Sequence, residues 1–101
     1  MLNNPAGHRY EICADGQLAG HLEYRHVGDH LTMTHTEILP AFEGLGLASR
    51  LARGALDDAK AHGLKVNPQC DFVAGYIRKH PDYVDLVDHA HRGLFDDGDT
   101  S

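Results

Sequence analysis

The sequence predicts an α+β domain in which two helices flank a mainly antiparallel sheet, in the order β-β-β-α-β-α. Residues 8–38 alternate between apolar and polar side chains and are interrupted by short glycine turns, which is typical of a strand meander. From residue 47, apolar residues recur every three or four positions, as on one face of a helix. A chain of 101 residues suffices for one small domain with one core.

The alternation predicts strands at residues 8–14, 18–27 and 30–38, joined by turns at Asp15-Gly16 and Gly28-Asp29. The first strand presents Tyr10, Ile12 and Ala14 on one face, and the second presents Leu22 and Tyr24. In the third, Leu31, Met33 and His35 are expected to share a face, with the threonines and Ile38 opposite. Residues 1–7 are expected to be a loose start.

A helix is predicted from Leu47 to Gly63, where the glycine closes it. "LKVNPQC" at residues 64–70 alternates again and predicts a short strand, and Asp71 is suited to cap a second helix that Pro81 ends. "DYVDLV" at residues 82–87 is compatible with a final short strand. The expected domain therefore spans residues 1–88, and residues 89–101 form an acidic, flexible tail.

Composition excludes several classes of function. The net charge of −6 argues against nucleic-acid binding, which needs clustered Lys and Arg. No apolar run is long enough to span a membrane, and no secretory signal is visible, so a cytoplasmic protein is expected. Cys13 and Cys70 read as reduced thiols, and the nine histidines show no zinc-helix spacing, so no metal site is predicted.

The segment "EGLGLAS" at residues 43–49 joins a strand to a helix through two glycines. A helix N-terminus carries unpaired N–H groups and a partial positive charge, and glycines let an anion approach the backbone. Spacing alone leaves a phosphate cradle and a tight turn about equally favoured. The lysine of a P-loop is missing after Gly46, and Ser49 is a poor third glycine for a dinucleotide fingerprint.

Residues 35–66, "HTEILPAFEGLGLASRLARGALDDAKAHGLKV", resemble the acetyl-CoA-binding segment of the Gcn5-related N-acetyltransferase (GNAT) superfamily. Its motif Gln/Arg-x-x-Gly-x-Gly/Ala falls on residues 43–48. The run "NPQCDFVAGYIRKHPDYVDLV" at residues 67–87 is similar to the short, single-domain YjdJ-type acetyltransferase-like subgroup, which carries Pro-x-Cys-x-Phe-Val, Tyr-Ile and His-Pro-x-Tyr in this order. The resemblance covers most of residues 8–88 and implies a minimal GNAT-like acyl-CoA acyltransferase fold.

The resemblance also implies a binding mode for acetyl-CoA as co-substrate. Pantetheine is expected along the backbone near Ile38 and Leu39, and the pyrophosphate on the loop N–H groups. Lys79 and His80 are candidate phosphate contacts, or simply a solvated helix end. Glu43 departs from the family, which has Gln or Arg there. Weaker CoA binding is expected from its charge, or the side chain points outward and simply favours the helix N-terminus. The expected cofactor-binding residues of the loop are Glu43, Gly44, Leu45, Gly46, Leu47 and Ala48.

Acetyl transfer to an amine needs a base for the amine and a proton for the leaving thiolate. Glu37 is the candidate base, with His35 as another, although a solvated carboxylate and a half-buried strand residue are the plainer readings. Cys70 precedes a helix, which favours a lowered thiol pKa, and is a candidate acetyl acceptor or proton donor, or a small buried side chain. Tyr76 is the second candidate donor, or a core aromatic residue.

The function predicted is an acetyl-CoA-dependent N-acetyltransferase for a small-molecule or peptide amine. The alternative is a module that binds CoA or acetyl-CoA with little transfer, because the short chain lacks elements that enclose an acceptor in larger relatives. The acceptor is not identified, although the acidic balance favours a cationic one. A monomer or weak homodimer is expected, with neither nucleic acid nor membrane as a partner.

Overall fold

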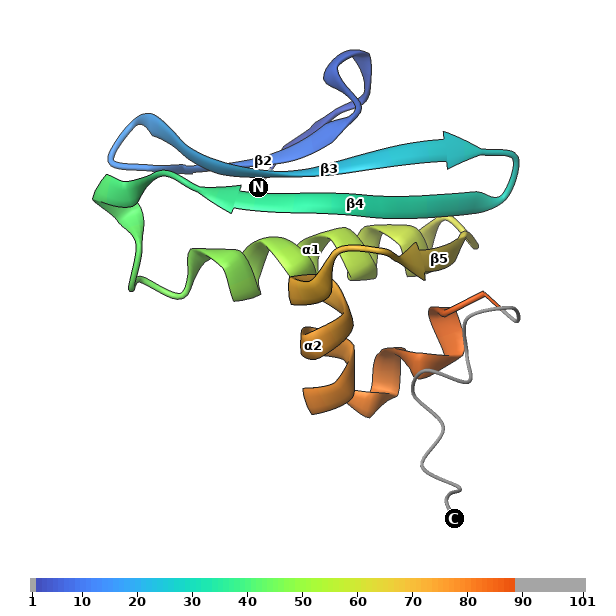
Figure 1. The fold of residues 1–101 in the computed structure, drawn as a ribbon. Helices are drawn as coiled ribbons and strands as arrows, with labels where there is room; N and C mark the ends of the chain where they lie inside the picture. The colour runs from blue at the N-terminus through green and yellow to red at the C-terminus, as the bar shows by residue number, and fades with distance from the viewer. Residues whose placement is uncertain (1, 89–101) are drawn as a thin grey trace.

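The computed structural model describes residues 2–88 as a five-stranded sheet, in the order β1-β2-β3-β4-β5, with two helices on one of its faces (Figure 1). All neighbouring strands pair antiparallel except β4 and β5, which are parallel. This confirms the predicted α+β class and a mainly antiparallel sheet. The elements are β1 (Leu2–Asn4), η1 (Pro5–Gly7), β2 (Arg9–Ala14), β3 (Gln17–Val27), β4 (His30–Ile38), η2 (Pro40–Phe42), α1 (Leu47–Ala61), β5 (Lys65–Pro68), α2 (Asp71–Lys79) and η3 (Pro81–Leu86).

Three local expectations are corrected. Residues 2–4 are not loose but form β1, whose Leu2 pairs with Glu11 of β2. Residues 81–86 form a 3-10 helix instead of a strand, because Pro81 at its start has the fixed φ that a helical turn needs; only Val87 bridges to β5. Cys70, not Asp71, is the N-cap of α2. The predicted tail at residues 89–101 lies outside the described residues.

One apolar core fills the space between the sheet and the helices. Tyr10, Leu22 and Leu31 of the sheet and Leu51 and Leu56 of α1 are almost fully buried in it. At this size each such side chain contributes about 2 kcal/mol by leaving water. The face of the sheet turned away from α1 and α2 is covered by no α-helix in residues 2–88 (Figure 1). It is therefore available to solvent and to ligands.

A hydrogen bond fixes α1 against the sheet. The Tyr10 hydroxyl donates to Asp58 Oδ2 at 2.7 Å. Burial, and secondarily this bond to the Asp58 carboxylate, raises the pKa of Tyr10 well above its usual range. The phenol therefore remains a donor throughout the working pH range, and the buried polar end of the ring has a partner.

A β-bulge in β4 changes which side chains face the core. Glu23 pairs with His35, whereas the next residue Tyr24 pairs with Met33, so Thr34 is an extra residue in β4. An extra residue reverses the alternation of a strand beyond it. Met33 is consequently buried, while His35 points to the uncovered face. The prediction that His35 shares a face with Leu31 and Met33 is wrong for this reason.

The bulge lies where β4 and β5 diverge. The last pair of the parallel ladder is Met33 with Pro68, and the Cys70 N–H then donates to the Met33 carbonyl at 2.9 Å. Beyond this point the second half of β4 has no strand beside it on the β5 side within residues 2–88. The edge of β4 is thus open next to the loop that leads into α1.

Candidate functional site

The loop between β4 and α1 ends in two glycines with left-handed backbone conformations. Gly44 has φ 84° and Gly46 has φ 73°, where any L side chain would be strained. Gly46 is the N-cap of α1, and no side chain caps the first N–H groups of this helix. These donors and the positive end of the helix dipole suit an anionic ligand.

A cavity of about 390 Å³ lies over this helix start. A Cβ placed on Gly44 or Gly46 would meet no other atom within 4 Å, so open space lies directly above the backbone there. A second cavity of about 200 Å³ shares Ser49 and Phe72 with the first and extends along α2. The two adjoin, and together they run from the end of β4 past the glycines to α2.

Most predicted cofactor-binding residues line these cavities, and three do not. The first cavity is lined by Ile38, Glu43, Gly44, Gly46, Leu47 and Ala48 from the predicted set, and the second by Lys79. Leu39, Leu45 and His80 do not line either cavity. The sequence did not predict Phe42, Ser49 and Phe72 as site residues; they come from η2, α1 and α2 and meet at the cavity through the packing of these elements.

At the end of β4, the backbone groups of Ile38 and Leu39 differ in whether they already have a partner. The Leu39 N–H already donates to the Ala19 carbonyl of β3 at 2.8 Å. Because backbone groups alternate between the two sides of a strand, those of Ile38 point to the side where β5 has diverged. Among the predicted pantetheine contacts, Ile38 therefore has free backbone groups, whereas the N–H of Leu39 is occupied.

Cys70 lies on the helix-covered side of this divergence. Its side chain is buried, and its Sγ–H donates to the Thr36 hydroxyl oxygen at 3.3 Å. Its carbonyl accepts the Ala74 N–H at 3.0 Å in the first turn of α2. The thiol is thus held beside the first turn of α2. Thr36 was not predicted as a site residue, since a contact across 34 residues leaves no local signal.

Glu37 and His35 lie on the opposite, uncovered face of β4. His35 Nε2 and Glu37 Oε1 are 3.3 Å apart, and both side chains are about half exposed. The three predicted catalytic residues therefore do not form one cluster, because Glu37 is separated from Cys70 and Tyr76 by the strand itself. The gap between β4 and β5 connects the helix-covered face of the sheet with the uncovered face.

Tyr76 lines the second cavity from α2. Its ring packs edge-on against His80, with ring centroids 4.1 Å apart. The ring of Tyr83 is also near it, at a centroid distance of 6.0 Å. The phenol is half-buried, so it combines a fixed ring with access to the cavity.

Glu43 is exposed at the rim of the first cavity. Its N–H donates to the Pro40 carbonyl at 3.4 Å. Within residues 2–88 its carboxylate has no cationic side chain within 4.0 Å. Its charge is therefore uncompensated beside the glycine turn.

Residues 2–88 show neither a metal-binding cluster nor a membrane-spanning helix. They contain no grouping of three or more His, Cys, Asp or Glu side chains arranged to hold a metal ion. None of their helices has the length and apolar composition that a membrane span requires.

Comparison with solved structures supports the fold. The chain is similar to the NMR solution structure of a GCN5-like protein from Staphylococcus aureus, with a TM-score of 0.61 over 83% of this chain and 87% of that one. Sequence identity is 21%, so this likeness concerns the architecture. It agrees with the GNAT-like topology implied by the sequence resemblance.

Curated relatives give a closer sequence match over a shorter segment. Protein NATD1 from Gallus gallus and from Mus musculus are each 34% identical over 61 residues, which is 59% of this chain and 56% of theirs. Protein NATD1 from Homo sapiens is 34% identical over 61 residues as well, 54% of its length. The match thus spans just over half the length of these relatives.

A family model gives the broadest sequence match. The model described as GCN5-related N-acetyl-transferase matches residues 9–86. This range includes strands β2 to β5, the glycine loop, Cys70 and both α-helices. The chain therefore belongs to the GCN5-related N-acetyltransferase family.

Proposed function

We propose that this protein binds acetyl-CoA and transfers its acetyl group to an amine. The observation that carries the proposal is the position of Gly44 and Gly46, which open the N-terminus of α1 to a cavity beside the diverging strands. Membership of the N-acetyltransferase family supports the same reading. Acetyl-CoA, when bound, supplies an acetyl group activated as a thioester.

The residues around the cavities suit the parts of this co-substrate. The N–H groups of Leu47, Ala48 and Ser49 in the first turn of α1 would hold the pyrophosphate, with the glycines allowing close approach. The backbone of Ile38 would pair with the amides of pantetheine, as an added strand does. Lys79 would contribute a positive charge to the phosphates.

Proton transfer is assigned to side chains on both sides of β4. Glu37 would accept the proton of the acceptor amine, with His35 orienting its carboxylate. Cys70, held by Thr36, would return a proton to the departing thiolate or carry the acetyl group transiently. Tyr76 is the alternative proton donor. In either route the proton lost by the amine balances the one gained by CoA.

Two measurements test the proposal. Acetyl-CoA at about 100 times its Kd should stabilise the native state by about 2.7 kcal/mol and so raise the midpoint of thermal unfolding. Thiol release should then increase when amines are added to protein and acetyl-CoA. An unchanged midpoint at millimolar acetyl-CoA would exclude the cradle, and a raised midpoint without amine-stimulated release would exclude the transferase.

The uncovered face of the sheet favours one alternative. Because no α-helix in residues 2–88 encloses Glu37 and His35, an acceptor amine bound there would have few protein contacts around it. A protein that binds acetyl-CoA and only hydrolyses it slowly, at a rate independent of amines, would be a binding module. The same thiol-release assay separates this alternative from transfer.

A further inference from the structure

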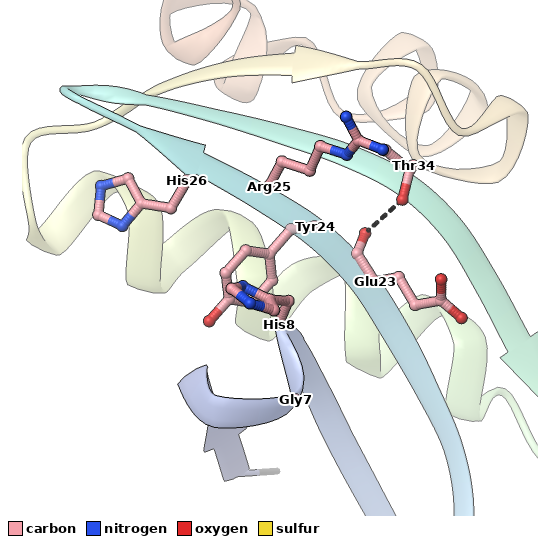
Figure 2. Close-up of a pocket in the computed structure, with 7 residues that line it drawn as sticks. All are labelled: Gly7, His8, Glu23, Tyr24, Arg25, His26 and Thr34. Atoms are coloured by element: carbon pink, nitrogen blue, oxygen red, sulfur yellow. Dashed lines mark hydrogen bonds between the residues drawn. The ribbon is translucent and has the colours of Figure 1, made fainter.

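A third cavity, of about 430 Å³, lies on the face of the sheet that the helices leave uncovered (Figure 2). Its floor is formed by residues of β3 and β4, and the end of η1 at Gly7 and His8 forms its wall. In Figure 2 the helices lie behind the strands, and the labelled side chains of Glu23, Arg25 and Thr34 are on the near side. None of the acetyl-CoA contacts proposed above lines it.

The cavity adjoins the point where acetyl transfer would occur. Thr34, the extra residue of the β4 bulge, lines it and directly follows Met33, the last residue paired with β5. Glu23 also lines it and pairs across the strands with His35, whose ring lies 3.3 Å from the Glu37 carboxylate. One end of the cavity is therefore next to the proposed base and to the gap between the strands.

Two residues of opposite charge line this cavity. Glu23 and Arg25 project from the same face of β3, two residues and about 7 Å apart along the strand. They do not pair with each other: the Glu23 carboxylate lies 2.9 Å from His21 Nε2, and Arg25 has no carboxylate within 4.0 Å among residues 2–88. The guanidinium is always charged, and its planar fork matches a carboxylate.

We propose that this cavity holds the acceptor, and that the acceptor is an amine that also carries a carboxylate. The inference rests on the proposed acetyl transfer. The acid group binds Arg25, and the amine lies at Glu23 and His35, next to Glu37. Because Glu23 and Arg25 are about 7 Å apart along the strand, amino acids with several carbons between amine and acid, such as 6-aminohexanoate or the lysine side-chain amine, fit better than glycine.

Transfer kinetics with matched acceptors test the inference. For wild type, 6-aminohexanoate should have a KM well below that of hexylamine, which lacks the acid group. Arg25→Gln should raise the KM for 6-aminohexanoate by about ten-fold or more, because a charged hydrogen bond is lost, and leave that for hexylamine unchanged. Lys60→Gln, which removes an exposed positive charge from α1 on the other side of the sheet, should change neither value.

Equal KM values for the two acceptors in wild type, or an Arg25→Gln effect that is the same for both, would overturn the inference while leaving the transferase intact. NMR titration gives a readout that does not need activity. Addition of 6-aminohexanoate, but not hexylamine, should shift the amide resonances of Arg25 and Thr34 in wild type and not in Arg25→Gln. Failure of the proposed transfer would appear separately, as the absence of thiol release with every amine. In that case, absence of the NMR shifts with 6-aminohexanoate would exclude the acceptor site as well.

Discussion

The Cys70 thiol donates a hydrogen bond to the Thr36 hydroxyl across the gap that opens between β5 and β4, at 3.3 Å. Thr36 faces the helices only because the bulge at Thr34 reverses the alternation of β4. Cys70 is placed by its backbone bond to Met33 and by capping α2. Two irregularities of the sheet thus bring a thiol and a hydroxyl together where β4 and β5 diverge.

Replacing the thiol tests its role in transfer. Cys70→Ser keeps a hydrogen-bond donor toward Thr36, so acetyl-CoA affinity by calorimetry should be unchanged, while the rate of acetyl transfer should fall by about ten-fold or more. Cys13→Ser, at the exposed cysteine, is the matched control and should transfer normally. An unchanged rate in Cys70→Ser would remove this residue from the mechanism and leave Tyr76 as the donor.

The two ends of α1 offer a matched pair of glycine substitutions. Gly46 and Gly63 have nearly the same left-handed φ, 73° and 68°, and open space around them. Gly46→Ala and Gly63→Ala should each lower the free energy of unfolding by about 1–2 kcal/mol through backbone strain. Only Gly46→Ala should weaken acetyl-CoA binding, because only its new methyl group enters the cavity. Equal affinities of the two variants would show that the pyrophosphate lies elsewhere.

The charge of Glu43 is expected to oppose the diphosphate. Removing roughly 1 kcal/mol of repulsion corresponds to about five-fold in Kd, so Glu43→Arg should tighten acetyl-CoA binding by at least this factor in calorimetry at low salt. Glu43→Gln should give an intermediate affinity, and the differences should shrink at high ionic strength. A loss of affinity in Glu43→Arg would mean that this side chain is not beside the phosphates.

Gly20 is required by close contact between β3 and β4. A Cβ at this position would lie 2.6 Å from the Glu37 carbonyl oxygen and would collide with the Ile38 side chain. Gly20→Ala should therefore destabilise the fold by about 1–3 kcal/mol in denaturant unfolding. Gly75→Ala, in a helix and with no atom within 4 Å of the new Cβ, should stabilise it by about 0.5–1 kcal/mol. A change in the free energy of unfolding with the same sign in both variants would contradict this interpretation.

Tyr83 predicts a pH dependence of stability. Its hydroxyl donates to Asp57 Oδ1 at 2.6 Å, and this bond, with burial as a smaller cause, raises the pKa of Tyr83 to about 12. A folded-state pKa above the ordinary value of 10.0 gives stability that is complete below pH 10 and is lost as pH rises through 12. The stability difference between wild type and Tyr83→Phe should therefore be constant up to about pH 10 and then decline. A difference that is independent of pH up to 12 would refute the bond.

Much of the fold was predictable because its signals are local. Alternation identified β2, β3 and β4, the helical period identified α1, and Asp15-Gly16 and Gly28-Asp29 both proved to be turns. The secondary structure of residues 2–4 and of residues 81–86 was predicted wrongly. The pairing of β1 depends on a partner strand, and a short apolar pattern after a proline suits a 3-10 turn as well as a strand.

The candidate site was predictable to the extent that it is a contiguous motif. Residues 43–48 were identified from the glycine spacing and the family resemblance. Gly44, Gly46, Leu47 and Ala48 line the first cavity, and Glu43 lies at its rim. The side of β4 on which Glu37 and His35 lie was not predictable, since the bulge arises from pairing with β3. The same is true of the cavity beside Arg25, whose walls come from three separate elements.

The sequence by itself determined the periodicities, the glycine-to-helix junction, the family and the unusual charge at Glu43, because each is carried by neighbouring residues. Only the tertiary structure decided that Cys70 meets Thr36, that the N–H of Leu39 is occupied by β3, and that Glu23 and Arg25 face a cavity instead of each other. These relationships depend on strand pairing and on one bulge. A shift of one residue in strand register would turn these side chains to the opposite face of the sheet, and no local sequence pattern encodes the register.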